Sequence, residues 1–494
     1  MEDSYFFARW DGTRFNTRGR SSCALGHRIA RGPDARADGI FAQWSWDGTC
    51  LTASNDRYGL FPLFYSCWDG AIAISSSIPR LLAAGAPGAL DQQAMSVFLR
   101  LGFFIGDDTP YAHIRALAPD ASLTWDGALH HTLGARANGA RHGAIARASA
   151  IDGYIELFRQ AIARRPPCGA SLAVPLSGGR DSRHILFELL RQGHRPDHCV
   201  TTRHYPPRTG EDARVAAAIA HELGLPHVVL AQTESWFEAE RRKNLLTNFC
   251  SDEHAWYLVA ADYLNARAPV VYDGIGGDVL SAALFVTPRR LALFGAHAHA
   301  AAGHLLGPEP PALVRLLPEA LYKNVSRERA LAHLETEVAR HLECPNPVGS
   351  FYFWNRTRRE IALVPYGLLG ALPNVFAPYL DHDLYDFLAG LPVQMLADHA
   401  FHSDTIARAY PQYAHIAYED KHASAPDASA CQARFGRALA LHLLPRAPSG
   451  MLRQRFVRPR LCASLLSRSF SASTHWYSPM ALYLHQLGTP SAPD

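Results

Sequence analysis

The sequence predicts an α/β protein built from two parts, and two patterns support this prediction. Between Ala173 and Leu230, short apolar strands alternate with amphipathic helices, an order typical of a parallel sheet wrapped by helices. Before residue 135, aromatic and β-branched stretches are interrupted by Asp-Gly turns, which favour short antiparallel strands. A chain of 494 residues is long enough for two or three domains with cores of their own.

The first part reads as a set of strands joined by tight turns. Large apolar residues alternate with smaller or polar ones at Phe41–Trp46, as in a strand. A turn then leads into Leu51–Gly59, and Pro62–Tyr65 follows. The stretch that follows residue 135 is rich in Ala, Gly, Arg and His and has little periodicity, as expected of a linker. We therefore place domains at 1–135 and 151–494, separated by a linker at 136–150.

Composition limits the partners of this chain. The net charge of +3 is too small to indicate a nucleic acid or a membrane surface as partner. The nine cysteines form no C-x-x-C pair and are odd in number, which fits reduced thiols in a cytoplasm. No basic-then-apolar N-terminal segment and no apolar run near the ~20 residues of a membrane span are present. We expect a cytoplasmic protein.

The second part begins with an amphipathic helix at residues 151–162, followed by regularly alternating elements. We expect strands at Ala173–Leu176, Cys199–Thr202 and His227–Leu230, with helices at Asp181–Gln192 and Glu211–Leu223. In such a sheet ligands bind at the carboxyl ends of the strands. Adenine would then lie near Val174, Leu176 and Thr201.

A glycine-rich turn follows the first of these strands. Glycines let the backbone approach a phosphate, the helix N-terminus points unpaired N–H groups at it, and two hydroxyls add donors. Asp181 at the mouth would repel phosphate unless a divalent cation lies between them, so the site suggests magnesium pyrophosphate. The residues proposed to hold pyrophosphate are Ser177, Gly178, Gly179 and Ser182. An ordinary Gly-rich turn is the alternative.

A second apolar strand also ends in glycines and an aspartate, at Val270–Asp278. The two loops resemble the SGGxDS and SGxGGDE segments of the asparagine synthetase family, whose members adenylate a carboxylate with ATP. The resemblance implies ATP and Mg²⁺ as cofactors, with Asp181 and Asp278 as magnesium ligands and Gly274 beside the nucleotide. It also implies a domain of the adenine nucleotide α-hydrolase type with a helical C-terminal part.

The N-terminal part resembles another module of the same family. The segment FAQWSWDGT followed by NDRYGLFPLFY is similar to a hairpin of class II glutamine amidotransferase domains, which implies an Ntn-type αββα sandwich. Those domains use an N-terminal cysteine as nucleophile and its own amine as base. Here position 2 is Glu2, and the earliest cysteine is the internal Cys23. We expect a degenerate glutaminase that is kept as a packing partner.

Two positions depart from the family pattern near the expected amine site. Ile275 stands where asparagine synthetases have Glu and β-lactam synthetases have Tyr, and an aliphatic side chain can neither take a proton nor bind ammonium. Asn374 replaces a Glu upstream of Ala377–Leu384, which resembles the VPFLDxxL segment. Drift in an inactive protein is the alternative.

Lys421 lies in a segment that resembles the family's phosphate-contacting lysine loop, which makes it the catalytic candidate for stabilising developing charge. An exposed loop lysine would look the same. Candidates for a general base are Glu419, Glu360 and Tyr366. Beyond residue 430 the chain is basic and helical, which suits either an acidic or peptide substrate or a solvated helix face.

The resemblance predicts an AMP-forming carbon–nitrogen ligase. Without a glutamine-derived ammonia source we expect the amine to belong to the substrate, as in synthetases that close lasso-peptide macrolactams, with a precursor peptide and a protease as partners. The alternatives are ammonia-dependent asparagine synthesis, ring closure of the β-lactam synthetase type, and an inactive scaffold. Release of AMP and pyrophosphate with each substrate separates them.

Overall fold

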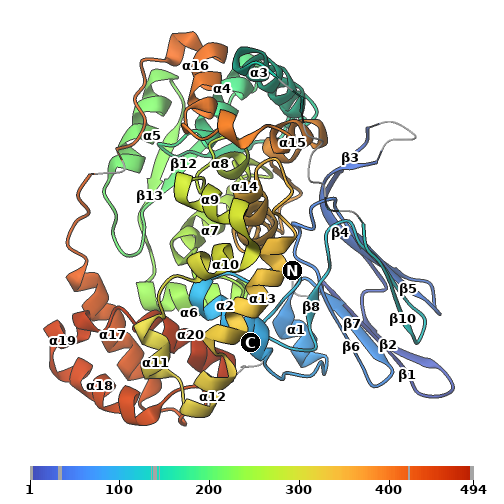
Figure 1. Cartoon of the computed structure of the whole chain (residues 1–494), viewed down its shortest axis with the longest axis vertical. Helices are drawn as coiled ribbons and strands as arrows, with labels where there is room; N and C mark the ends of the chain where they lie inside the picture. The colour runs from blue at the N-terminus through green and yellow to red at the C-terminus, as the bar shows by residue number, and fades with distance from the viewer. Residues whose placement is uncertain are drawn as a thin grey trace.

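The computed structural model describes residues 4–31, 36–134, 136, 142–143, 145–420 and 423–489. These residues form three five-stranded sheets, two antiparallel and one parallel, and a large number of helices (Figure 1). The antiparallel sheets lie on one side of the molecule, and the C-terminal helices lie at the other (Figure 1). The α/β class expected from the sequence is confirmed.

The first antiparallel sheet has the strand order β2-β1-β7-β6-β8 and is covered on both faces. Alternate residues of a strand point to opposite faces. Phe6 accordingly packs toward the second sheet, with its ring 5.5 Å from that of Trp46, while Phe7 joins the core formed with the helices α1 and α2. The strands are β1 (Tyr5–Trp10), β2 (Phe15–Gly19), β6 (Phe64–Trp68), β7 (Ala71–Ser75) and β8 (Arg115–Ala116), and the helices are α1 (Ile78–Ala83) and α2 (Gln92–Leu101).

The second antiparallel sheet has the order β10-β9-β5-β4-β3. Its inner face adds Trp44, Leu51 and Trp125 to the shared core, whereas Thr52 and Ser122 on the other face are exposed. One buried and one solvated face explains the alternating pattern seen in the sequence. The strands are β3 (Ser22–Ile29), β4 (Asp38–Trp46), β5 (Leu51–Asn55), β9 (Ser122–Trp125) and β10 (Leu129–Thr132).

The parallel sheet has the order β13-β12-β11-β14-β15, and every neighbouring pair is parallel. From β11 the chain adds strands first on one side of the sheet, β12 and β13, and then on the other side, β14 and β15. The order of the strands therefore switches between β11 and β14, and the crevice for ligands is expected beyond the carboxyl ends of these two strands. The strands are β11 (Leu172–Pro175), β12 (His198–Thr202), β13 (His227–Leu230), β14 (Val270–Tyr272) and β15 (Asn374–Phe376). Each of the three strands predicted between residues 173 and 230 is present.

Helices make up the rest of the described chain after residue 146. Around the parallel sheet are α3 (Arg147–Ala163), α4 (Asp181–Arg191), α5 (Glu211–Glu222), α6 (Trp236–Leu246), α7 (Leu258–Arg267) and α8 (Gly277–Leu280). Then follow α9 (Pro288–Ala296), α10 (Ala298–Leu306), α11 (Pro311–Leu316), α12 (Glu319–Asn324), α13 (Arg327–Ala339), α14 (Pro347–Tyr352), α15 (His382–Ala389) and α16 (Phe401–Ala409). The C-terminal group is α17 (Ser429–Leu443), α18 (Gln454–Leu466), α19 (Arg468–Ser473) and α20 (Ser478–Gly488). Two π-helical turns lie at Phe353–Thr357 and Val364–Leu368.

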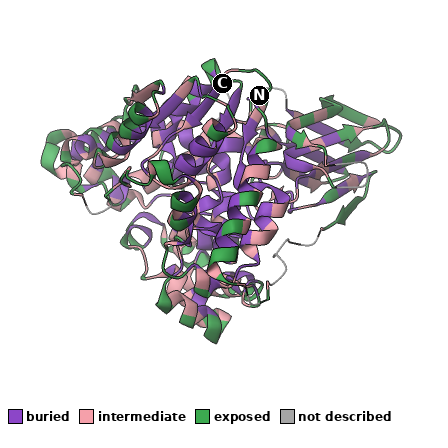
Figure 2. Ribbon diagram, turned by 90° about the horizontal axis from the view of Figure 1, so that it is seen from above, coloured by how far each residue is buried: buried purple, intermediate pink, exposed green. Residues whose placement is uncertain are grey.

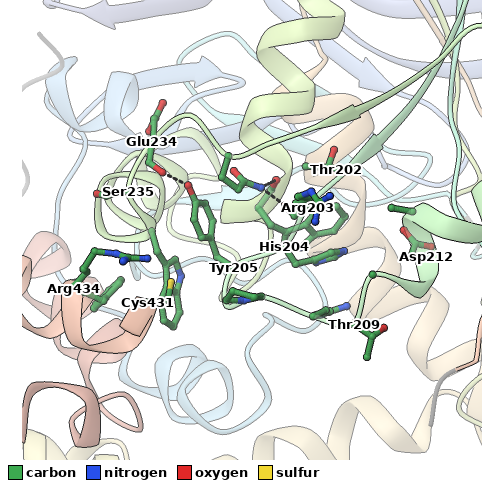
Figure 3. Close-up of a pocket in the computed structure, with 18 of the residues that line it drawn as sticks. Thr202, Arg203, His204, Tyr205, Thr209, Asp212, Glu234, Ser235, Cys431 and Arg434 are labelled. Carbon is green, nitrogen blue, oxygen red and sulfur yellow. Dashed lines mark hydrogen bonds between the residues drawn. The ribbon is translucent and has the colours of Figure 1, made fainter. Parts of the chain in front are cut away.

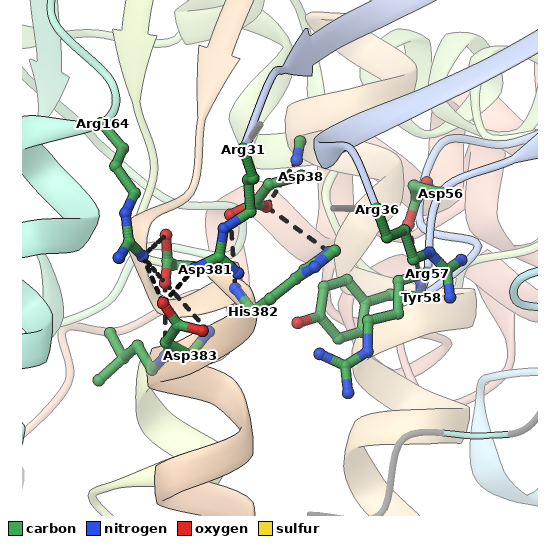
Figure 4. Close-up of polar contacts among 12 residues, drawn as sticks. Arg31, Arg36, Asp38, Asp56, Arg57, Tyr58, Arg164, Asp381, His382 and Asp383 are labelled. Carbon is green, nitrogen blue, oxygen red and sulfur yellow. Dashed lines mark hydrogen bonds and ion pairs between the residues drawn. The ribbon is translucent and has the colours of Figure 1, made fainter. Parts of the chain in front are cut away.

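A buried ion network joins the N-terminal sheets to the parallel-sheet half. The Arg165 guanidinium lies 3.0 Å from Asp38 at the start of β4 and 2.9 Å from Asp381 just before α15, and all three side chains are almost completely buried. Arg164 lies 2.8 Å from Asp381, and Figure 4 shows this pair beside Asp38 and His382. A paired charge can be buried, whereas an unpaired one is costly. The network therefore fixes the two halves against each other.

The hydrophobic core is continuous across the same boundary. One cluster includes Phe6 of the first sheet, Trp44 of the second and Val271 of the parallel sheet. Figure 2 shows buried residues running from the helical half into both antiparallel sheets. Within the described residues, no helix is both long and apolar enough to cross a membrane.

Candidate functional site

The glycine-rich loop after β11 is held in shape by its own side chains. Ser177 N–H donates to Ser182 Oγ at 3.0 Å, and the two serine hydroxyls are also 3.0 Å apart. Gly179 N–H donates to Ser177 Oγ at 3.2 Å, and Gly178 N–H donates to Asp212 at 2.7 Å. The predicted phosphate-binding groups thus form a compact turn at the N-terminus of α4, with Asp212 of α5 as an additional partner that no motif indicated.

The second glycine loop, which follows β14, interlocks with the first. A Cβ atom on Gly274 would lie 2.8 Å from Asp181 Cβ, and one on Gly277 would lie 2.5 Å from Asp181 Oδ1. Only glycine fits at such distances, and Gly276 between them has a φ of +92°, which also favours glycine. Because Gly277 directly precedes Asp278, this packing brings the second predicted aspartate next to the first.

Asp181 and Asp278 line one cavity of about 510 Å³. Its walls also include the loop glycines with Arg180, the segment before Lys421 with Tyr418, Glu419 and Asp420, and the side chains of Ala282, Leu284 and His399. The guanidinium of Arg183 stacks on the Tyr418 ring at 4.0 Å, and Glu419 N–H donates to the Gly178 carbonyl at 3.3 Å. Lys421 itself lies outside the described residues.

A buried histidine contacts the first aspartate. His402 Nδ1 of α16 lies 3.3 Å from Asp181 Oδ1 and 3.0 Å from Ser281 Oγ. Burial lowers the pKa of His402 to about 3, so the imidazole is neutral at physiological pH. The Tyr379 hydroxyl donates to the Asp181 carbonyl at 3.2 Å. Both residues contact the loop, and neither contact was expected from the sequence: His402 lies in no motif, and the motif segment that contains Tyr379 gave no sign of a contact with Asp181.

A larger cavity of about 710 Å³ adjoins the first at the same loop. Ser177 and Thr202 line it where β11 and β12 end, and Arg434 of α17 lies across it from Thr209 and Asp212 (Figure 3). The His204 and Trp256 rings form part of the wall, with centroids 4.0 Å apart. Glu419 lines both cavities, so a single extended ligand can pass from one to the other.

None of the three strand residues expected beside adenine, Val174, Leu176 and Thr201, is among the residues that line this cavity. Val174 and Leu176 are buried in and after β11. The Thr201 hydroxyl donates to the Leu176 carbonyl at 2.6 Å and lies 2.8 Å from His227 Nε2. Thr201 is thereby occupied within the sheet, and its neighbour Thr202 reaches the cavity.

The three candidate bases have different positions. Glu419 lines both cavities. Glu360 lies in the core, where burial and the nearby Asp252 raise its pKa well above the usual value and Ser251 Oγ donates to it at 3.2 Å. Tyr366 is fully buried in a π-helical turn, and burial raises its pKa well above normal.

The structure also shows the surroundings of Ile275 and Asn374, the two residues that depart from the family pattern. Ile275 is 5% exposed beside Asp278 in the second loop, where its N–H donates to Asp273 at 2.8 Å. Asn374 pairs with Val270 in the register of β15 and β14. Cys23 is half-buried on β3.

Comparison with known proteins supports this architecture. Residues 10–132 match the model of a glutamine amidotransferase domain, and residues 153–352 match that of asparagine synthase. No curated protein matches the chain. A solved glutamine phosphoribosylpyrophosphate amidotransferase from B. subtilis, in complex with ADP and GMP, shares 11% identity with a TM-score of 0.18. That similarity covers 46% of this chain and 59% of the length of that protein.

Two interlocked glycine loops thus lie at the switch point of a parallel sheet, and both are within the segment that matches the asparagine synthase model. An amidotransferase-type domain precedes this one in the chain. A segment similar to glutamine amidotransferase domains is thus followed in the chain by one similar to asparagine synthase.

Proposed function

We propose that this protein adenylates a carboxyl group with ATP, releasing pyrophosphate, and then transfers the acyl group to an amine, releasing AMP. One observation carries the proposal. Asp181 and Asp278, from the loops that end the adjacent strands β11 and β14, line the same cavity as Gly178 and Gly179. The larger cavity beside Thr202 has room for the adenosine, and the shared wall at Glu419 leads from it to the loop glycines.

The residues of the smaller cavity fit magnesium. Mg²⁺ prefers oxygen ligands and takes one or two carboxylates together with substrate phosphates, rather than a cage made only of protein. This preference supports the proposal, because Asp181 and Asp278 line one cavity together with Gly178 and Gly179. Asp181 and Asp278 would hold the ion, which neutralises phosphate charge when bound.

The other residues of the site position the reactants. Ser177, Ser182 and the N–H groups of Gly178 and Gly179 exchange their loop hydrogen bonds for the pyrophosphate oxygens. Gly274 allows the close approach of the second loop to Asp181. Lys421 stabilises the negative charge that grows on the α-phosphate and on the acyl carbon's oxygen.

The amine belongs to the substrate. Ile275, which is buried three positions before Asp278, offers no group that could take a proton or bind ammonium, and this favours an amine delivered by a larger molecule. We propose that carboxyl group and amine lie on one peptide, so that the product is a macrolactam. The N-terminal half, residues 1–135 ahead of a linker at 136–150, serves as a packing partner for the synthetase half at 151–494.

Replacing either aspartate tests the core of this proposal. We expect Asp181→Asn and Asp278→Asn each to reduce pyrophosphate release from ATP by about 100-fold or more. Each variant loses a carboxylate that would hold the magnesium ion, and with it the neutralisation of phosphate charge. Asp152→Asn is a matched control, since Asp152 is exposed on α3 and pairs with Arg408 at 2.7 Å. The assay is pyrophosphate and AMP release with a candidate precursor peptide, followed by mass spectrometry for the loss of water.

Three outcomes would contradict parts of the proposal. Unchanged turnover in either aspartate variant would contradict the assignment of this cavity as the nucleotide site. Turnover with aspartate and ammonia would show that the protein synthesises asparagine and does not act on a peptide. Absence of ATP binding by the wild-type chain would indicate a scaffold.

A further inference from the structure

The C-terminal helices differ sharply in charge from the rest of the molecule. Residues 428–489 contain eight arginines and no lysine, aspartate or glutamate. Since the whole chain carries +3, this segment contributes +8 and the remainder −5. The arginines are Arg434, Arg437, Arg446, Arg453, Arg455, Arg458, Arg460 and Arg468.

These positive charges form no close pairs with acidic side chains in the described part of the chain, although Glu319 interacts electrostatically with Arg453 and Arg455. Within the ranges that the structure describes, none of the eight arginines forms an ion pair. Helix α6 packs against α17 through the Trp236 and Phe435 rings, but its acidic side chains are already paired. The pairs are Glu234 with Arg242, Glu238 with Arg241 at 2.8 Å, and Glu240 with Lys243 at 3.0 Å. The charge of α17 is therefore available to a ligand.

Three side chains form an exposed stripe along α17. Arg434, Arg437 and Leu441 are spaced three and four residues apart, which places them on one face of the helix. All three are exposed, and Leu441 has 65% of its surface in solvent. Because Arg434 also lines the larger cavity, the stripe begins at the mouth of that cavity and extends about 10 Å away from it.

We infer that this stripe docks an acidic segment of the polypeptide whose carboxyl group is adenylated, an inference that rests on the proposed function. A stripe of about 10 Å matches roughly three residues of extended polypeptide. Two arginines followed by a leucine fit two carboxylates followed by an apolar side chain. The segment would thereby hold its peptide at the entrance of the ATP cavity. The net charge of −5 over the rest of the molecule disfavours a long nucleic acid.

Helix α18 provides an internal comparison. Arg455, Arg458 and Leu466 are likewise exposed on one face. Here, however, an acid of the protein is close: Lys323 lowers the pKa of Glu319, and Arg453 and Arg455 add to that effect. The larger cavity is lined by α17 instead. A charge reversal at Arg458 on α18 therefore serves as a control that changes the net charge equally but lies away from the larger cavity.

The test is fluorescence anisotropy of a fluorescein-labelled peptide of alternating Glu and Leu residues, titrated with the full chain without ATP. We expect Arg437→Glu to weaken binding about 10-fold and Arg458→Glu to weaken it less than about 2-fold, with a stronger effect at low salt. A peptide with Lys in place of Glu should not bind. Equal loss in both variants would overturn the inference, as would equal binding of a single-stranded oligonucleotide of the same charge.

ATP binding, measured separately by calorimetry, distinguishes this inference from the proposed function. Arg437 lies outside both cavities, so Arg437→Glu should bind ATP with wild-type affinity. Intact ATP binding with no peptide binding would overturn the docking stripe alone. Peptide binding by a chain that does not bind ATP would overturn the proposed function.

Discussion

Single glycines and single carboxylates decide how the site is built. The glycines of both loops were expected to let the backbone approach phosphate. The structure shows a second role for two of them. Gly274 and Gly277 leave the space into which Asp181 fits, so the two loops form one unit. A side chain at either position would push Asp181 away from Asp278 before any nucleotide bound.

How far the site was predictable depends on where its residues lie in the chain. Asp181 and Asp278 each end a recognisable apolar strand, and parallel strands present their carboxyl ends at the same edge, so their meeting could be predicted. His402 and Tyr379 come from distant segments and reach Asp181 only through tertiary packing, and the family-like segment around Tyr379 does not reveal this contact. The hydrogen bond from Gly178 N–H to Asp212 could not be predicted either, because it joins the loop to a helix that follows the next strand in the sequence.

The buried carboxyl of Asp56 should make stability depend on pH. Burial raises its pKa to about 6, although it accepts hydrogen bonds from the N–H groups of Tyr58, Leu60 and Phe61. Between about pH 4, where the unfolded chain ionises, and pH 6, the unfolded state loses a proton that the folded state keeps. The contribution of Asp56 to stability is therefore greatest below pH 4 and is lost as the pH rises through 6.

We expect the free energy of unfolding of the wild type, relative to Asp56→Asn, to fall by about 3 kcal/mol between pH 4 and pH 7. Urea unfolding of both proteins across this range measures the difference. A difference that does not change with pH would show that Asp56 is ionised in the folded protein throughout.

At the scale of elements, local strand and helix patterns predicted the first half of the parallel sheet well. The expected strands and helices between residues 173 and 230 agree with β11 to β13 to within a residue or two at their ends. β15 could not be predicted as a strand, because its three residues gain their pairing only from β14, about a hundred residues earlier in the chain. The π-helical turns near Phe353 and Val364 also follow from packing rather than from a local pattern.

Packing of α17 against α19 depends on a glycine within a helix. A Cβ on Gly436 would lie 2.5 Å from Ser471 Oγ and 2.8 Å from the Ser471 carbonyl oxygen. Alanine normally favours a helix over glycine by about 1 kcal/mol, but here the overpacking outweighs that gain. We expect Gly436→Ala to lower the free energy of unfolding by about 2 kcal/mol, as measured by urea denaturation.

Gly303 of α10 is the matched control for this substitution. The nearest atom to a Cβ there is 4.0 Å away, so Gly303→Ala should raise stability by up to about 1 kcal/mol. If Gly436→Ala proved as stable as Gly303→Ala, the close packing of α17 on α19 would be wrong.

At the scale of the whole molecule, two halves with separate sheets behave as one body. The shared core and the buried network of Arg165, Asp38 and Asp381 connect them. Burial raises the pKa of Asp381, but Arg165 and Arg164 outweigh this and hold the pKa below its usual range. The halves were predicted separately from sequence, whereas their junction was not, because no local pattern shows which charges will be buried together.

Removing the central cation should be costly. We expect Arg165→Met to lower the free energy of unfolding by about 3–5 kcal/mol, since it leaves the buried Asp38 without its arginine partner and Asp381 with Arg164 alone. Arg57→Met is the control: Arg57 also joins the halves, at 2.6 Å from Asp386, but that carboxylate is 43% exposed and the loss should stay below about 1 kcal/mol. Thermal unfolding of both variants measures the difference, and equal losses would contradict a special role for Arg165.

The order of the three charged residues along the chain has a consequence for synthesis in the cell. Asp38 leaves the ribosome early, Arg165 follows, and Asp381 emerges only when most of the polypeptide has been made. The N-terminal sheets can form meanwhile, but the junction cannot close until the last of the three arrives. A chain that ends before Asp381 would thus leave Asp38 and Arg165 without the third member of their cluster.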